Sequence, residues 1–144
     1  MAITVTKSNH FKQLVNQGDN HWDTDTYLLI LLAAGFTFDK DAHSTYDHAD
    51  IGTYEIATGN GYTQKTHAVV IASVTEDDVN DRSRVALSAV TITASGAIPD
   101  FTQAVIINAT SADDTVVCHI NYDATISLTD GISFIQSAFN YDEE

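Results

Sequence analysis

The stretch Thr26-Tyr-Leu-Leu-Ile-Leu-Leu-Ala-Ala34 is the most apolar part of the chain, and it carries no charge. It follows the polar turn Asp23-Thr-Asp25 and is closed by Gly35. A bilayer span needs about 20 apolar residues, so this run is too short for one. A continuous apolar run between turn residues is typical of a strand buried on both faces, although a buried helical segment has the same pattern. Because other elements must then cover both faces, we expect this strand to be the centre of the fold.

The length and composition of the chain indicate one folded domain. A chain of 144 residues usually forms one domain, and it can bury about 70% of its unfolded surface without disulfides or metals. With one cysteine, Cys118, no disulfide can form within the chain, and we expect a buried, inert thiol. The first residues contain no long apolar segment of the kind found in signal peptides, so we expect synthesis in a reducing cytoplasm.

The chain is strongly acidic. It has 6 Lys and Arg against 20 Asp and Glu, which gives a formal net charge of -14. Such a surface repels phosphate backbones and anionic lipid heads, so nucleic acids and membranes are not expected partners. The charge favours solubility, and it predicts a partner that is basic or that binds through apolar and backbone contacts.

A short amphipathic helix is predicted near the N-terminus. Phe11, Leu14 and Val15 have the spacing of one helical face. Ser8 is suited to cap the start of this helix, and Gly18 is suited to end it. So short a helix is marginal alone and must lie on an apolar surface. We expect that surface to be the central strand.

The remaining strands are predicted from alternating or β-branched segments between turns. They span residues 3–5, 36–38, 67–74, 84–93, 103–108, 115–122, 123–130 and 132–139. Within 84–93, alternation places Val85 and Leu87 on one face and Val90 and Ile92 on the other.

The segments between the strands predict turns and one further helical turn. Residues 42–52 form a loop with that helical turn, and Gly59-Asn-Gly61 a tight turn. Tyr141-Asp-Glu-Glu144 is expected to be a frayed acidic tail. Many short strands without intervening helices predict a mainly β fold, an antiparallel β-sandwich or jelly-roll-like barrel in a single domain over residues 1–144.

No catalytic or metal site is predicted. His43 and His48 lie five residues apart among aspartates, whereas a spacing of three or four would place them on one helical face. We expect a solvated loop there. Cys118 and His119 are adjacent in a predicted strand and so point to opposite faces, which disfavours a shared metal or a nucleophile pair. No stretch matches an EF-hand, a phosphate-binding loop or a nucleophile elbow. We therefore expect no enzymatic activity and no cofactor.

Arg82 and Arg84 are the last basic side chains of the Lys and Arg type in the chain. Local ion pairs with Asp77, Asp78 or Asp81 are the expected arrangement, and such surface pairs contribute little to stability. Pairing with an acidic patch on a neighbouring copy is the alternative.

Several segments, taken in order, resemble a family of tailed-bacteriophage virion proteins. They are the leader Met1-Ala-Ile-Thr-Val-Thr6, the helical Asn9-His-Phe-Lys-Gln-Leu14, the turn and strand Asp23-Thr-Asp-Thr26 and Tyr27-Leu-Leu-Ile-Leu-Leu32, then Phe36-Thr-Phe-Asp39, Gly59-Asn-Gly-Tyr-Thr63, Thr91-Ile-Thr-Ala94, Ala104-Val-Ile-Ile107 and Ile132-Ser-Phe-Ile-Gln136. The chain lacks the Arg-Tyr-Ala segment of that family, and its acidic C-terminal tail differs.

This resemblance implies a structural role in the virion and no catalytic residues. We expect a capsid decoration or cement protein, made in the host bacterial cytoplasm and bound to the capsid surface. Its partners would be the major capsid protein and further copies of itself in a homo-oligomer. Trp22, Tyr46 and Tyr54 are predicted to be exposed contact residues, with core packing as the alternative for each.

Two other functions stay open at the level of sequence. The first is another virion location: a tail, head–tail junction or fibre-base component. The second is a carbohydrate- or calcium-binding β-sandwich module, which the aromatic residues Trp22 and Tyr62 in acidic loops suggest.

Overall fold

The computed structural model describes residues 3–47 and 49–143. Its elements are β1 (Thr4–Lys7), α1 (Asn9–Gln17), β2 (Tyr27–Leu32), α2 (Ala49–Tyr54), β3 (His67–Val69), β4 (Ile71–Asp77), β5 (Arg82–Leu87), β6 (Val90–Thr93), β7 (Ile98–Asn108), β8 (Thr115–Leu128), β9 (Ser133–Gln136) and β10 (Phe139–Glu143).

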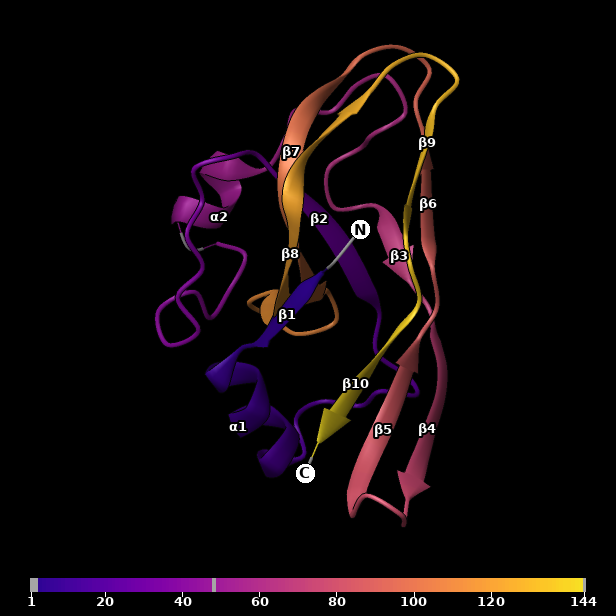
Figure 1. The fold of residues 1–144 in the computed structure, drawn as a ribbon. Helices are drawn as coiled ribbons and strands as arrows, with labels where there is room; N and C mark the ends of the chain where they lie inside the picture. The colour runs from indigo at the N-terminus through magenta and orange to yellow at the C-terminus, as the bar shows by residue number, and fades with distance from the viewer. Residues whose placement is uncertain (1–2, 48, 144) are drawn as a thin grey trace.

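The strands form two layers, with α2 on the outer side of the first layer (Figure 1). The first layer is a five-stranded sheet in the order β1-β8-β7-β2-β3. The second layer contains the three-stranded sheet β10-β5-β4 and the two-stranded sheet β6-β9. All strand pairs are antiparallel. The predicted fold class, a mainly β antiparallel sandwich with one short N-terminal helix, is confirmed.

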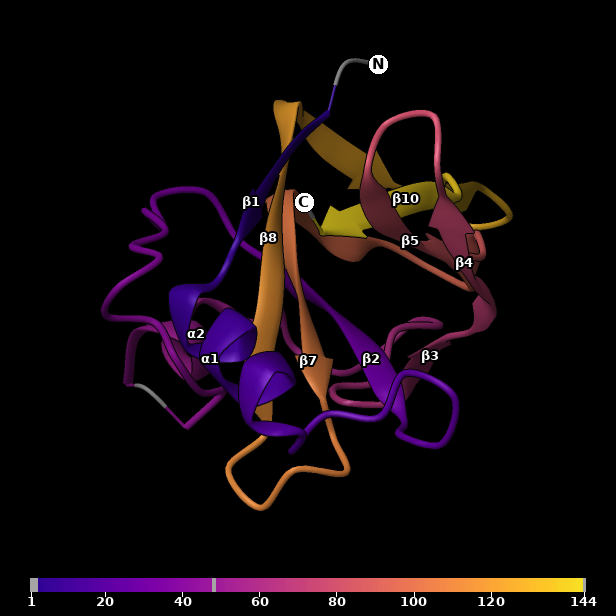
Figure 2. The same ribbon diagram turned by 90° about the horizontal axis from the view of Figure 1, so that it is seen from below.

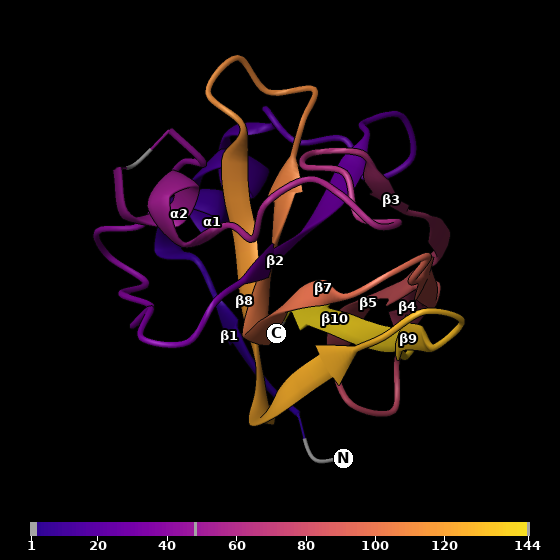
Figure 3. The ribbon, with the colours of Figure 1, turned by 90° about the horizontal axis from the view of Figure 1, so that it is seen from above.

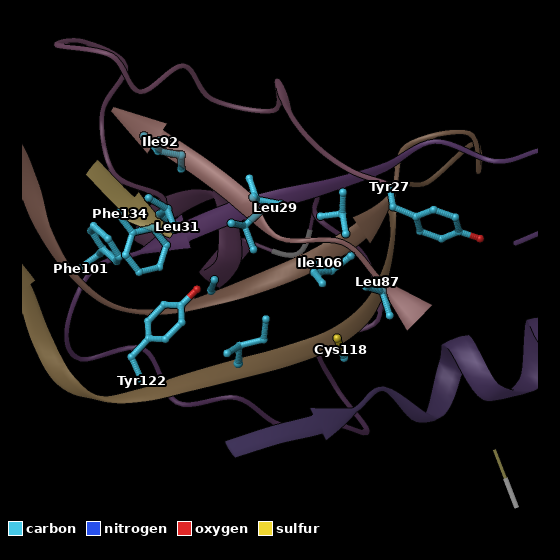
Figure 4. Close-up of a cluster of buried hydrophobic side chains, with 14 of the residues drawn as sticks. Tyr27, Leu29, Leu31, Leu87, Ile92, Phe101, Ile106, Cys118, Tyr122 and Phe134 are labelled. Carbon is cyan, nitrogen blue, oxygen red and sulfur yellow. The ribbon is translucent and has the colours of Figure 1, made fainter. Parts of the chain in front are cut away.

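The central strand β2 is buried on both faces, as predicted. Leu29 and Leu31 belong to the large core between the layers, where Figure 4 shows them beside side chains of both layers. Leu28, Ile30 and Leu32 belong to a smaller core under the loop that leads to α2. Alternate residues of a strand point to opposite faces, so one short strand contributes to both cores. Burying each of these side chains stabilises the fold by about 1.5–3 kcal/mol.

Two segments predicted as single strands are each two strands in the structure. They are 67–74, which contains β3 and most of β4, and 84–93, which contains most of β5 and all of β6. The predicted strand 132–139 corresponds to β9, and β10 begins only at its last residue. The break between β5 and β6 has a clear packing reason. It shifts the alternation by one position, so that Val85, Leu87, Val90 and Ile92 are all buried. The prediction that the two pairs face opposite ways was therefore wrong.

Other strand predictions need correction as well. The segments 115–122 and 123–130 form one strand, β8, whose pairing with β7 shifts register between Gln103↔Asn121 and Phe101↔Ile126. Asp123, in a left-handed conformation (φ 58), lies at this irregularity. Residues 36–38 form no strand. The carbonyl of Phe36 instead accepts a hydrogen bond from the side chain of Gln103 (2.9 Å). The tail is not frayed over residues 141–143, because β10 pairs with β5.

The helix α1 begins and ends as predicted. The Ser8 hydroxyl accepts a hydrogen bond from the Phe11 amide (3.5 Å), and Gly18 ends the helix with φ 79. The helix lies against β8 rather than on β2 (Figure 2). Its buried residue Phe11 packs edge-on against Trp22 and Tyr141, at ring distances of 5.2 and 5.8 Å.

Candidate interaction surface

The two layers are joined on one side and open on the other. On the joined side β3 pairs with β2 and leads directly into β4 of the second layer. On the open side β1 pairs with β8 and β10 pairs with β5, and neither has a second partner strand among residues 3–47 and 49–143. Figures 2 and 3 show the sandwich from its two ends, and in Figure 2 the end of β10 reaches toward β1 and β8. Free strand edges are the parts of a sheet that can pair with another chain.

A groove of about 800 Å³ lies on this open side, between β1, α1 and β10. We call it the β1–β10 groove. Its lining is Val5, Lys7, Lys12, Val15, Asn16, Asn140, Tyr141 and Asp142. A smaller hollow of about 190 Å³ lies between the start of β1 and the end of β9. Both hollows combine apolar and polar side chains.

Local structure explains which side chains reach the β1–β10 groove. Val5 and Lys7 are two residues apart in β1, so both point to the same face of the strand. In α1 the core-facing position is Phe11, which leaves Lys12 and Val15 to face the groove. The capped ends of α1 fix the helix at the position where these side chains meet β10.

The β1–β10 groove also holds two lysines that form no ion pair with a described side chain. Four of the six Lys and Arg residues form ion pairs with carboxylates: Lys40 with Asp41, Lys65 with Asp114, and both Arg82 and Arg84 with Asp77 and Asp142. Lys7 and Lys12 have no carboxylate of a described side chain within ion-pair distance. The Lys7 ammonium instead lies over the Tyr141 ring, 4.5 Å from its centroid.

The acidic side chain in the groove is already neutralised. Arg84 donates hydrogen bonds to both carboxylate oxygens of Asp142 (3.0 and 3.4 Å), and Arg82 lies 2.9 Å from it. The bond from Arg84 is the main reason that the pKa of Asp142 is lowered. The predicted local pairing of Arg82 and Arg84 with Asp77 is confirmed, and the pairing with Asp142 was not foreseen because it is distant in sequence. The groove is therefore locally positive on an acidic protein.

The three predicted contact residues do not lie together in this groove, and none is fully exposed. Trp22 is half-buried and stacks on Tyr27 at a ring distance of 4.8 Å. Tyr46 and Tyr54 are half-buried and pack against the smaller core. The expectation that they are exposed aromatics was wrong, while a role at an interface stays a prediction.

The buried carboxylate of Glu55, whose backbone pairs with Leu32 of β2, was missed by sequence reasoning. Glu55 accepts hydrogen bonds from the hydroxyls of Tyr46 and Tyr62, the latter at 2.9 Å. The Tyr62 hydroxyl also accepts one from the amide of Leu31 in β2 (3.2 Å). Burial, followed by the negative charge of Glu55, raises the pKa of Tyr62. Tyr62 is 1% exposed. The suggestion from the sequence that its ring could contact a carbohydrate was therefore wrong.

The histidine-containing loop is packed rather than solvated at His43. This side chain is buried, and its Nδ1 accepts a hydrogen bond from the Asp39 amide (2.8 Å). Beside it, the ring of Phe38 stacks on His119 at 4.9 Å. The prediction of a solvated loop was therefore wrong for His43, and His48 lies outside the described residues.

Cys118 and His119 point to opposite faces of β8, as predicted. Cys118 lies in the large core, where burial raises the pKa of its thiol to about 12. His119 instead faces Gln103, whose Oε1 lies 2.6 Å from Nε2. Because the Gln103 amide nitrogen donates to Phe36, its oxygen is the acceptor and His119 donates from Nε2. The two side chains cannot act as a pair.

The acidic turns are occupied by local contacts. Asp77 accepts hydrogen bonds from Asn80 and Arg82 (2.9 and 3.0 Å), and Asp113 accepts one from Thr115 (2.7 Å). No group of three or more potential metal ligands occurs among the described residues. Within the same part of the chain, no helix is long and apolar enough to cross a membrane.

Comparison with known proteins gives no relative. No protein-family model matches the chain, no curated protein matches it, and no solved structure matches it.

Proposed function

We propose that the protein is a capsid decoration or cement protein of a tailed bacteriophage, which binds the assembled shell as a homo-oligomer. The segment-by-segment resemblance described above supports the phage assignment. The mainly β fold suits a structural role, because a sandwich presents rigid strand edges and loops to a partner.

The β1–β10 groove is the observation that carries this proposal. A protein of virion assembly must be soluble alone and then bind through a preformed surface. The net charge of -14 provides solubility. The groove provides the surface, with two strand edges and two lysines on its walls that have no pairing partner in the described part of the chain. Backbone groups of a free edge give affinity, and the side chains around it give specificity.

Mass spectrometry of purified virions tests the proposal. A decoration protein is expected in the particle in a fixed, high ratio to the major capsid protein. Labelled antibodies against it should mark the whole shell in electron micrographs. Absence from the particle would refute the virion assignment.

The tail, head–tail junction or fibre-base location is distinguished by the same measurements. A component of these structures would be present in only a few copies per particle. Antibody label would then gather at the tail or at one vertex, and the decoration role would be replaced by that location.

A further inference from the structure

We infer that the tip of the β4–β5 hairpin of one copy docks into the β1–β10 groove of a second copy. This inference rests on the homo-oligomeric part of the proposed function, and it names the partner of the groove. The hairpin tip is the turn at residues 78–81, which lies between β4 and β5.

The hairpin tip is a projecting acidic and apolar knob. The hairpin extends away from the body of the molecule at the lower right of Figure 1. Asp78, Val79, Asn80 and Asp81 are all exposed there, and Val79 is 92% exposed. Neither Asp78 nor Asp81 forms an ion pair with a described side chain. The tip therefore offers two free carboxylates and one apolar side chain.

The hairpin tip is also preorganised. The side chain of Asp77 accepts a hydrogen bond from the Asn80 amide group and another from Arg82, which fixes the turn from inside. Arg82 is in turn fixed by Asp142 of β10, at 2.9 Å. A rigid projecting element loses little conformational entropy when it docks, which favours association.

The groove complements the tip in charge and in polarity. Lys7 and Lys12 are the two basic side chains without a carboxylate partner among described side chains, and both line the groove. Asp78 and Asp81 would pair with them. Val5 and Val15, which are partly buried against the large core, supply apolar wall for Val79. Between two proteins of net charge -14, complementary patches of this kind decide the orientation in which copies can approach.

The docking must occur between copies. In each copy β4 pairs with β5 and β5 with β10, so the tip is held at the end of the sheet and cannot fold back across β10 into its own groove. Tip and groove consist of different residues, so two copies can exchange the contact reciprocally in a closed dimer, or pass it on head-to-tail. The head-to-tail arrangement produces a closed ring when the rotation closes, and an open chain when it does not.

Two charge-reversal variants, one changed in the groove and the other in the tip, test the inference when they are mixed. The first variant, Lys7→Glu/Lys12→Glu, has an acidic tip and an acidic groove. The second, Asp78→Lys/Asp81→Asn, has a basic tip and a basic groove; asparagine is chosen because residue 81 has φ 50, which asparagine tolerates. Each variant alone should associate at least about tenfold more weakly than wild type, while their equimolar mixture should assemble in alternation.

Analytical ultracentrifugation at an ionic strength of about 0.15 M measures the association, with circular dichroism to verify folding. Lys40→Glu is the matched charge control for the single substitution Lys7→Glu, since Lys40 pairs with Asp41 outside the groove, and it should assemble like wild type. Val79→Ser should weaken association, whereas Val70→Ser, at another exposed valine, should not.

A mixture that stays monomeric would overturn the inference, as would a wild-type protein that is monomeric at every concentration tested. Equal loss in Lys40→Glu would also overturn it. A monomer that is nevertheless present on virions in high copy number would refute only this docking. Absence from virions would refute the proposed function and leave the docking to be judged by the ultracentrifuge.

Discussion

At the scale of single residues, the Tyr62 hydroxyl connects a turn to the central strand. It donates to the buried carboxylate of Glu55 and accepts from the Leu31 amide. Tyr62→Phe would remove one hydrogen bond from the Glu55 carboxylate and one from the Leu31 amide, and both of these groups are buried. We expect a loss of about 1–3 kcal/mol in the free energy of unfolding, measured by urea denaturation.

Tyr122→Phe is the matched control for that substitution. The Tyr122 hydroxyl is equally buried, but it has no hydrogen-bond partner among the described residues. Its removal should change stability by less than about 0.5 kcal/mol or increase it. Equal effects of the two substitutions would show that the Tyr62 hydrogen bonds contribute nothing specific.

His119 makes stability depend on pH. Burial, and then the nearby His43, lowers its pKa from 6.5 to about 4 in the folded protein. Between these values the unfolded chain binds more protons, so stability falls as pH decreases from about 6.5 to 4, by up to about 3 kcal/mol. Urea unfolding of wild type and His119→Asn across this range measures the effect. The free energy of unfolding of the variant should depend less on pH in this range. An unchanged pH dependence would mean that other groups cause it.

At the scale of elements, the turn at 59–62 depends on contact with β6. Gly61 has φ 99, and a Cβ added to it would lie 2.2 Å from the carbonyl oxygen of Thr93. Gly131 also has a positive φ (80), but a Cβ there would meet nothing within 4 Å. Both alanine substitutions therefore carry backbone strain, and only Gly61→Ala adds a steric clash with backbone.

We expect Gly61→Ala to be more destabilising than Gly131→Ala by about 1–3 kcal/mol, measured as the difference in thermal or urea unfolding. Similar losses for the two variants would mean that the turn moves away from β6 at little energetic cost.

The elements differ in how well the sequence predicts them. The burial of β2, the caps of α1 at Ser8 and Gly18, and the glycine turn follow from local pattern, and the structure has them. The breaks that divide two predicted strands were missed because they follow from packing between layers. At Ser88 the backbone amide bonds to the carbonyl of Val70 (2.8 Å), a contact that no local pattern indicates.

The candidate surface was less predictable than the fold for a related reason. Its walls come from β1, α1 and β10, which lie at opposite ends of the chain. Single aromatic residues such as Trp22 were predicted as contacts because tyrosine and tryptophan are common at interfaces. Their burial depends on neighbours that only the folded chain supplies. That Lys7 and Lys12 form no ion pair with a described side chain was detectable only after the other four bases had been placed beside their carboxylates.

At the scale of the whole molecule, the excess of acidic groups should oppose compactness. Local ion pairs neutralise only a few of the 20 Asp and Glu residues. Raising the ionic strength from about 0.01 to about 0.15 M shortens the Debye length from about 30 to about 8 Å. We therefore expect the melting temperature to rise with salt, measured by differential scanning calorimetry. Measurements in sodium chloride and in tetramethylammonium chloride separate charge screening, which both salts provide, from binding of the small sodium ion to carboxylates. A fall in melting temperature would mean that the ion pairs around Asp77 and Asp142 dominate instead.

The apolar sequence of β2 has a consequence for how the sheet finds its alignment. A slip of β2 by one residue would exchange Leu29 and Leu31 with their neighbours and still bury leucine or isoleucine on both sides, so hydrophobicity alone specifies the pairing poorly. Polar contacts at the strand's boundaries supply the missing information. The Thr26 amide bonds to the Thr110 hydroxyl (2.8 Å), and the Asn108 amide group bonds to Asp25 (2.8 Å). These hydrogen bonds favour the observed register of β2, and we expect their loss to allow competing, misaligned strand pairings.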